Sequence, residues 1–110
     1  MTTKTTDWNA QDWITVRDGV FRKAFSGEGA TLALHRLEPG HAPMPHHHPF
    51  EQIVYIVEGE MDFHVGDQVH RVSAGQLLVI PPDVMHHGVV VGDAPAINLD
   101  VFTPRRPDYD

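Results

Sequence analysis

Residues 40–59 read GHAPMPHHHPFEQIVYIVEG, with three consecutive histidines followed by a run rich in β-branched and aromatic residues. Such a run is typical of a β-strand. Side chains two apart on a strand point to the same face, so His46 and His48 share a face while His47 points away. Two imidazoles at this spacing can both reach one metal ion. The stretch therefore predicts a metal-binding strand.

Another residue in this stretch is an even number of positions from His46 and His48, as a residue on the same strand face must be. Gln52 lies on their face provided that the strand continues through Pro49, whereas Glu51 has the opposite parity. Metal sites without cysteine can use amide and carboxylate oxygens as well as imidazoles. Strand parity thus favours Gln52 as the partner of the two imidazoles.

A third imidazole must come from a neighbouring strand. His86 and His87 follow a turn at residues 81–83, and the spacing alone leaves either of them open as the ligand. An isolated H-x-H pair is a weak signal, but a second histidine-bearing turn at hairpin spacing makes a metal site the better interpretation. The remaining isolated histidines are predicted to be ordinary strand or loop residues: His35, His41, His64 and His70.

The composition limits the chemistry. The chain of 110 residues is long enough for one domain with a single core, and we expect that core to span about residues 13–103. There is no cysteine, which excludes disulfides, thiolate metal sites and cysteine nucleophiles. The formal net charge of −7 argues against nucleic acid as a partner, because phosphates need a basic surface.

No segment is predicted to enter a membrane. No apolar run approaches the ~20 residues that a helix needs to cross a bilayer. The first residues, MTTKTTDWNAQDW, lack the apolar region of a signal peptide. We therefore expect a cytoplasmic protein.

Short strands separated by turn signals fill the rest of the chain. Asp18-Gly19 and Gly66-Asp67 are examples of these signals, and no segment shows sustained helical periodicity. Regular short strands without helices indicate an all-β sandwich or closed barrel. The expected strands cover residues 13–17, 20–25, 30–37, 52–58, 61–65, 68–72, 77–80, 84–91 and 97–102.

Two motifs resemble those of the cupin superfamily. The first cupin motif is G-x5-H-x-H-x3/4-E-x6-G, and its positions are occupied here by Gly40, His46, His48, Gln52 and Gly59. The resemblance implies a small cupin domain, which is a double-stranded β-helix or jelly-roll barrel. It also implies a metal site in the mouth of that barrel.

The second cupin motif is G-x5-P-x-G-x2-H-x3-N. Its positions are occupied here by Gly75, Pro81, Asp83, His86 and Val90. This register selects the first of the two adjacent histidines as the third imidazole ligand. The resemblance thus implies one divalent metal, with Ni, Zn, Mn, Co or Fe all compatible, held by His46, His48, Gln52 and His86.

The replacement of the motif's carboxylate by Gln52 changes the expected chemistry. Three neutral imidazoles and an amide leave the metal its full +2 charge. Such a site is a stronger Lewis acid toward an anionic or carbonyl oxygen. It is less suited to high-valent iron, which counts against an oxygenase.

The end of the chain resembles that of the KdgF-type pectin degradation proteins. Residues 100–109, DVFTPRRPDY, match the ending D-V-F-[ST]-P-x-R-x-D-[YF] of that family, except that Pro107 replaces its usual Glu. The same family has the His-x-His-x3-Gln ligand set. The resemblance implies an enzyme that converts 4,5-unsaturated monouronates, from pectin or alginate breakdown, into linear keto-uronates by ring opening and tautomerisation.

Asp100, Phe102 and Arg106 match the pocket residues of that family by position. The resemblance implies that Asp100 moves a proton as general base or acid, that Phe102 forms an apolar wall, and that Arg106 binds the uronate carboxylate. The residues alone leave another role open for each of these three positions. In that alternative, Asp100 only orients a metal ligand, Phe102 is a core residue, and Arg106 is a solvated residue of the tail.

Other functions are compatible with the same ligand set, since a fold does not determine a function. They are a polyketide cyclase-like cupin, a metal-dependent lyase, an iron dioxygenase and a non-catalytic sugar-binding module. A lyase would need a tyrosine base in the pocket, and of the two tyrosines Tyr55 has the wrong parity relative to Gln52, which leaves Tyr109. By analogy with small cupins we expect a homodimer that hides its sheet edges.

Overall fold

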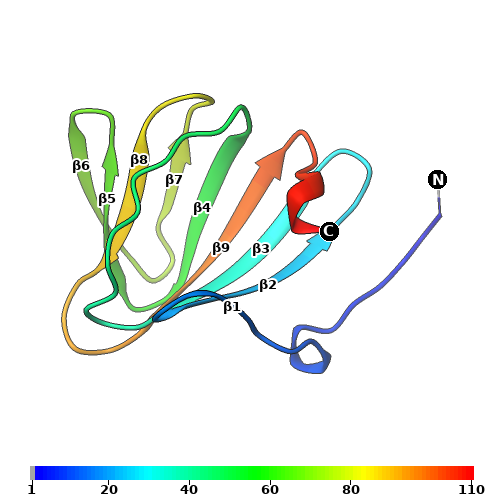
Figure 1. The fold of residues 1–110 in the computed structure, drawn as a ribbon, viewed down its shortest axis with the longest axis horizontal. Coiled ribbons are helices and arrows are strands. Elements are labelled where there is room, and N and C mark those ends of the chain that lie inside the picture. The colour runs from blue at the N-terminus through cyan, green and yellow to red at the C-terminus, as the bar shows by residue number, and fades with distance from the viewer. Residues whose placement is uncertain (1) are drawn as a thin grey trace.

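The computed structural model describes residues 2–110, which form nine strands and two 3-10 turns (Figure 1). All nine predicted strands are present, and no end differs from its predicted position by more than two residues. Neither turn is long or apolar enough to cross a membrane. The strands are β1 (Ile14–Arg17), β2 (Val20–Ser26), β3 (Thr31–Leu37), β4 (Glu51–Glu58), β5 (Glu60–Val65), β6 (Gln68–Ser73), β7 (Leu77–Ile80), β8 (His86–Val90) and β9 (Ala96–Thr103), and the turns are Trp8–Ala10 and Pro107–Tyr109.

Two antiparallel sheets make up the fold. The larger sheet has six strands in the order β1-β2-β3-β9-β4-β7, and the smaller has three in the order β6-β5-β8. Strands far apart in the sequence lie side by side, since β9 is hydrogen-bonded to both β3 and β4. Such long-range pairing is typical of a jelly roll. The all-β prediction is confirmed.

The core lies between the two sheets. Along β4, Val54 and Ile56 are fully buried while Tyr55 and Val57 are exposed, which is the alternation of a strand with one inward face. Both sheets contribute to one buried apolar cluster, so burial of this cluster holds them together. Its members are Val20, Leu37, Val54, Ile56, Met61, Phe63, Val72, Ile80 and Ala96.

Two glycines allow chain segments to approach closely. Gly59, the last residue of the first motif, has a φ of +85°, and a Cβ there would lie 2.8 Å from the carbonyl oxygen of Pro95. A Cβ on Gly88 would lie 2.8 Å from the ring of Phe63, on the inner side of β8. A side chain at either position would force backbone or core atoms to move.

The segment that carries the consecutive histidines is not a continuation of β4. The strand begins at Glu51, after a bend at residues 49–50, so the expectation of an unbroken strand through Pro49 is wrong. Proline has no N–H to donate to a ladder. Instead, His46 forms an isolated antiparallel bridge with His86, with N–H to O distances of 3.0 and 2.9 Å. This bridge holds the segment against the start of β8.

The outward face of the six-stranded sheet is apolar across most of its width. Strand register places nine apolar residues in two adjacent rows, where an antiparallel sheet facing water usually carries polar side chains. We call this surface the outer plate. Its first row is Phe25, Leu32, Val101, Ile53 and Val79, and its second row is Leu34, Leu99, Tyr55 and Leu77.

The two ends of the described chain pack onto β2. Lys23 donates to the backbone oxygen of Trp8 at 2.6 Å and lies over the ring of Trp13, so the N-terminal segment folds back onto the body. The C-terminal turn lies near the ends of β9, β3 and β2 (Figure 1). Its Tyr109 ring stacks against the guanidinium group of Arg22 on β2.

Candidate metal centre

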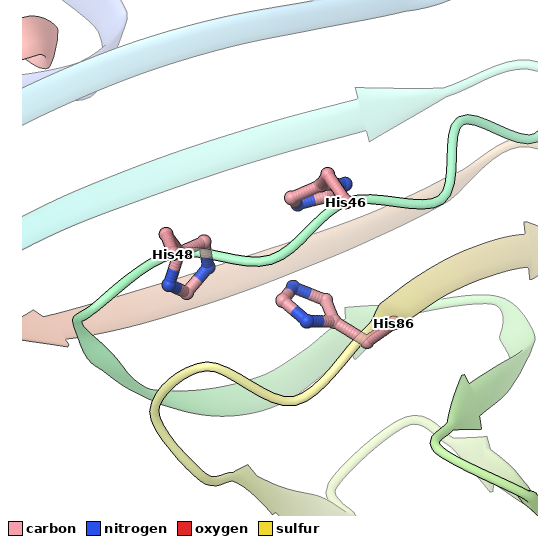
Figure 2. A group of neighbouring side chains, drawn as sticks. All are labelled: His46, His48 and His86. Carbon is pink, nitrogen blue, oxygen red and sulfur yellow. The ribbon is translucent and has the colours of Figure 1, made fainter.

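Three histidines from two parts of the chain surround one space. His46 and His48 come from the segment before β4, and His86 begins β8 (Figure 2). One ring nitrogen of each residue lies within 4.8 Å of those of the other two. The structure thus brings together the three imidazoles that parity and motif spacing predict.

The same kind of hydrogen bond orients each of the three rings. Each Nδ1 lies 2.8–3.0 Å from a backbone carbonyl oxygen two residues away in the chain. A carbonyl oxygen only accepts, so each Nδ1 carries a proton and each Nε2 keeps a lone pair when the ring is neutral. Metal-binding histidines typically have this arrangement, because it fixes the tautomer that binds through Nε2.

The Nε2 atom of His86 is buried and has no hydrogen-bond partner among the described residues. Burial lowers the pKa of His86 to about 4, so this ring is neutral at physiological pH and its free lone pair is available. A buried polar atom without a partner destabilises a fold. A cation at this point would satisfy it.

Gln52 is held in a fixed orientation by Asp100. Its amide nitrogen donates to Asp100 Oδ1 at 3.0 Å, and because a carboxylate oxygen only accepts, the amide oxygen must face the other way. That oxygen lies 3.1 Å from Nε2 of His48. The sequence places Gln52 and His48 four residues apart, and the bend at residues 49–50 brings both side chains to the same space.

The contact between His48 and Gln52 therefore joins two acceptors. Nε2 of His48 offers a lone pair, and so does Oε1 of Gln52. Burial is the main cause that lowers the pKa of His48, so a second proton on this ring is not favoured. Two lone pairs at 3.1 Å repel each other unless a cation lies beside both.

A divalent metal fits these residues. Two ligand atoms that bind one ion at a right angle, each at ~2.1 Å, are themselves about 3.0 Å apart, which agrees with the 3.1 Å contact. Three imidazole nitrogens and an amide oxygen suit several first-row metals. The residues that would hold it are His46, His48, Gln52 and His86.

Asp100 is the centre of a buried polar network. Besides the amide of Gln52, it accepts hydrogen bonds from the side chain of Asn98 at 2.9 Å and from Nδ1 of His35 at 2.7 Å. Its exposed fraction is 3%. His35 was predicted to be an ordinary strand residue, and that interpretation misses its contact with the carboxylate. The signal available was its position on the same strand face as buried Ala33.

A cavity of about 120 Å³ opens beside the three histidines. Asp100, Phe102 and Arg106 all contribute to its wall, together with His46 and Gln52. Phe102 is 2% exposed, and its ring contacts that of His48 at a centroid distance of 5.5 Å. Phe102 is thus both a buried core residue and part of the cavity wall.

Arg106 is a wall residue rather than a solvated tail residue. Its side chain is only 12% exposed, and its guanidinium lies over the rings of Phe102 and Tyr109 at 4.7 and 4.0 Å. Two of its nitrogens donate to the Asp108 carboxylate, at 3.2 and 2.8 Å. This pairing lowers the pKa of Asp108.

Tyr109 and Arg22 also line the cavity. The sequence left Tyr109 only as the tyrosine available to a lyase, and it did not single out Arg22. Both depend on how the C-terminal turn folds back, which no local pattern specifies. Burial raises the pKa of the Tyr109 phenol, which disfavours the phenolate that a lyase would use as its base.

Parity and motif spacing reject His87 and Glu51 as metal ligands, and neither side chain joins the group of three histidines. His87 stacks on His64 of the neighbouring strand, with ring centroids 4.3 Å apart and an angle of 8° between the planes. Glu51 is exposed. The structure thus places His86 and Gln52, rather than their neighbours, close to His46 and His48.

The family model described as "Cupin domain" matches residues 33–102, which is more than half of the chain and includes both motifs. This protein is a cupin. The match runs from β3 to β9, so it covers all three histidines, the amide ligand and Asp100.

Several known proteins resemble this cupin. The solved structure of KdgF from Halomonas sp. is 28% identical, covers 97% of this chain and 98% of its own, and superposes with a TM-score of 0.89. "Polyketide synthase CurC" from Streptomyces cyaneus is 34% identical over 83 residues, 72% of this chain and 54% of that protein. The polyketide cyclase RemF from Streptomyces resistomycificus shares the fold, with 20% identity, coverage of 96% and 82%, and a TM-score of 0.81. The chain spans about half the length of the curated relatives it matches first.

Replacing His86 should abolish metal binding. The variant His86→Ala loses one of three imidazoles, and we expect metal affinity to fall by more than about 100-fold, because even the outer partners of metal ligands typically contribute 10–100-fold. The matched control is His87→Ala, which removes the adjacent imidazole and should retain the metal. Elemental analysis of both proteins after dialysis measures the bound metal. Equal metal content in the two variants would contradict the assignment.

Proposed function

We propose that this cupin is a metal-dependent enzyme that opens the ring of 4,5-unsaturated monouronates and tautomerises the product to a linear keto-uronate. The observation that carries the proposal is the position of Asp100, Phe102 and Arg106, which line one cavity with three of the four proposed metal ligands, His46, Gln52 and His86. These residues were selected by their resemblance to the KdgF-type ending. The structural similarity to KdgF over nearly the whole chain supports the same activity.

The reaction needs proton transfer and no net oxidation or reduction. The C1 hydroxyl loses its proton and becomes a carbonyl as the bond between C1 and the ring oxygen breaks, which leaves an enol at C5. That enol becomes a ketone when its hydroxyl loses a proton and C4 gains one. When bound, the metal would act as a Lewis acid on a substrate oxygen. The chain itself must therefore supply a group that exchanges protons beside the metal ligands.

Asp100 and His35 supply that group. The carboxylate is within hydrogen-bond distance of both His35 and the ligand amide, so it can take a proton and share it with the imidazole. Both residues line the cavity, which places them within reach of a bound molecule. Asp100 thus both orients a metal ligand and exchanges a proton.

The wall residues favour a small acidic molecule. Arg106 presents a guanidinium group, which suits a carboxylate, and its present partner is the carboxylate of Asp108. Phe102 adds an apolar surface beside His48. A monouronate carries both a carboxylate and the apolar carbon face of a sugar.

A polyketide is the second candidate substrate. The identity to CurC favours it, because CurC is a polyketide protein by name. The cavity of about 120 Å³ argues against it, because pockets for drug-sized ligands are roughly 300–1,000 Å³. A multi-ring polyketide would have to lie largely outside this cavity.

Turnover of an unsaturated uronate tests the proposal. The metal-loaded protein should consume 4,5-unsaturated galacturonate, with loss of the enol absorbance, and chelator should stop it. Asp100→Asn should lower kcat by at least about 100-fold, since positioned proton transfer contributes typically 10²–10⁴-fold. The control is Asp62→Asn, which removes a carboxylate paired with Arg71 on the smaller sheet and should leave kcat unchanged.

Metal content is measured in the same samples, because Asp100 also orients Gln52. An Asp100→Asn variant that keeps both its metal and its full activity would contradict the role of Asp100. A wild-type protein that holds metal and leaves the unsaturated uronate unchanged would overturn the proposed substrate.

A further inference from the structure

The cavity carries more positive charge than the proposed roles use. Three arginines line it, Arg17, Arg22 and Arg106, against one carboxylate, Asp100. The protein as a whole has a formal net charge of −7. A positive cavity in an acidic protein concentrates the field on a bound anion.

Arg17 and Arg22 are the two lining arginines without a carboxylate partner in the described chain, and Arg22 is the one that contacts Tyr109. Within residues 2–110, the guanidinium of Arg22 forms no ion pair and no hydrogen bond, whereas Arg106 is paired with Asp108. Its contact is the ring of Tyr109, with the guanidinium carbon 3.8 Å from the ring centroid. This stack uses the flat face of the guanidinium and leaves its N–H groups free to donate at the edge.

Tyr109 holds the two arginines together. Its ring contacts the guanidinium of Arg22 at 3.8 Å and that of Arg106 at 4.0 Å. Two cations in one small space repel each other, and an aromatic ring in contact with both offsets part of that repulsion. The C-terminal turn thus positions a pair of guanidiniums at the cavity.

The strand register places this pair close to the proton-transfer group. Arg22 on β2 lies directly across from His35 on β3, and His35 is bonded to Asp100 at 2.7 Å. Neighbouring strands are about 4.8 Å apart. A small molecule whose anionic end binds Arg22 can therefore reach the carboxylate and the metal ligands with its other atoms.

We infer that Arg22 and Arg106, held by the ring of Tyr109, form a subsite that binds the carboxylate group of a small organic acid, and that Arg22 is its specificity-determining member. The inference rests on the proposed function for the identity of that acid, a monouronate. Arg22 supplies the unoccupied guanidinium, and Arg106 joins it when the ligand carboxylate replaces that of Asp108.

A binding experiment with an unreactive probe tests the subsite. Calorimetric titration of the metal-loaded protein with galacturonate and with galactose compares two sugars that differ at C6, where the acid carries a carboxylate. Galacturonate lacks the 4,5-double bond and cannot undergo the reaction. We expect the wild type to bind galacturonate at least about tenfold more tightly, because hydrogen bonds to charged groups are strong enough for that.

Arg22→Gln should abolish the preference for galacturonate. Tyr109→Phe keeps the ring and should retain the preference, whereas Tyr109→Ala should weaken it. The control is Arg71→Gln, an exposed arginine on the smaller sheet. Arg22→Lys, which keeps the charge without the flat stacking group, should recover only part of the preference and guards against misfolding of the Gln variant.

The outcomes for the subsite and for the proposed function are separable. A wild type that binds both sugars equally, or neither, overturns the subsite whatever its turnover. An Arg22→Gln protein that keeps the preference also overturns it. If Arg22 discriminates between the sugars and the unsaturated uronate is not consumed, the subsite stands and the proposed reaction fails.

Discussion

The contact between Nε2 of His48 and Oε1 of Gln52, at 3.1 Å, governs how the whole site is arranged. Neither atom can donate, because the backbone oxygen of Phe50 fixes the proton of His48 on Nδ1 and the carboxylate of Asp100 fixes the amide of Gln52. The two lone pairs and the unpartnered Nε2 of His86 then converge on one space (Figure 2). A divalent cation would remove the repulsion among them, and the cavity lies beside that point.

This constraint gives a physical reason for the glutamine at the ligand position. A glutamate at position 52 would place a second carboxylate about 3 Å from Asp100, and like charges at that distance destabilise each other. The amide instead donates to Asp100 and leaves its oxygen available to a metal. The sequence departure from the cupin motif and the presence of Asp100 on β9 are therefore two parts of one arrangement. It keeps a carboxylate beside the metal ligands without making it a ligand.

Much of this arrangement could be predicted from the sequence, and the exceptions have clear causes. The nine strands follow from alternation and turn residues, and spacing selected His86 and Gln52, which the structure places close to His46 and His48. The expected continuity through Pro49 is wrong because a proline bend precedes β4, yet the bridge between His46 and His86 restores the predicted grouping. The contacts of His35, Arg22 and Tyr109 were not predicted, because they come from cross-strand register and from the return of the C-terminal turn, which are long-range features.

X-ray absorption spectroscopy of the metal-loaded protein tests the proposed ligand set directly, because it reports the ligands of the ion itself. We predict three imidazole groups with metal–nitrogen distances of about 2.0–2.2 Å and at least one oxygen in the same shell. We also predict that Gln52→Ala keeps the three imidazoles and alters the oxygen contribution. A spectrum with two or fewer imidazoles, or one that is unchanged in Gln52→Ala, would contradict a site of three histidines and Gln52.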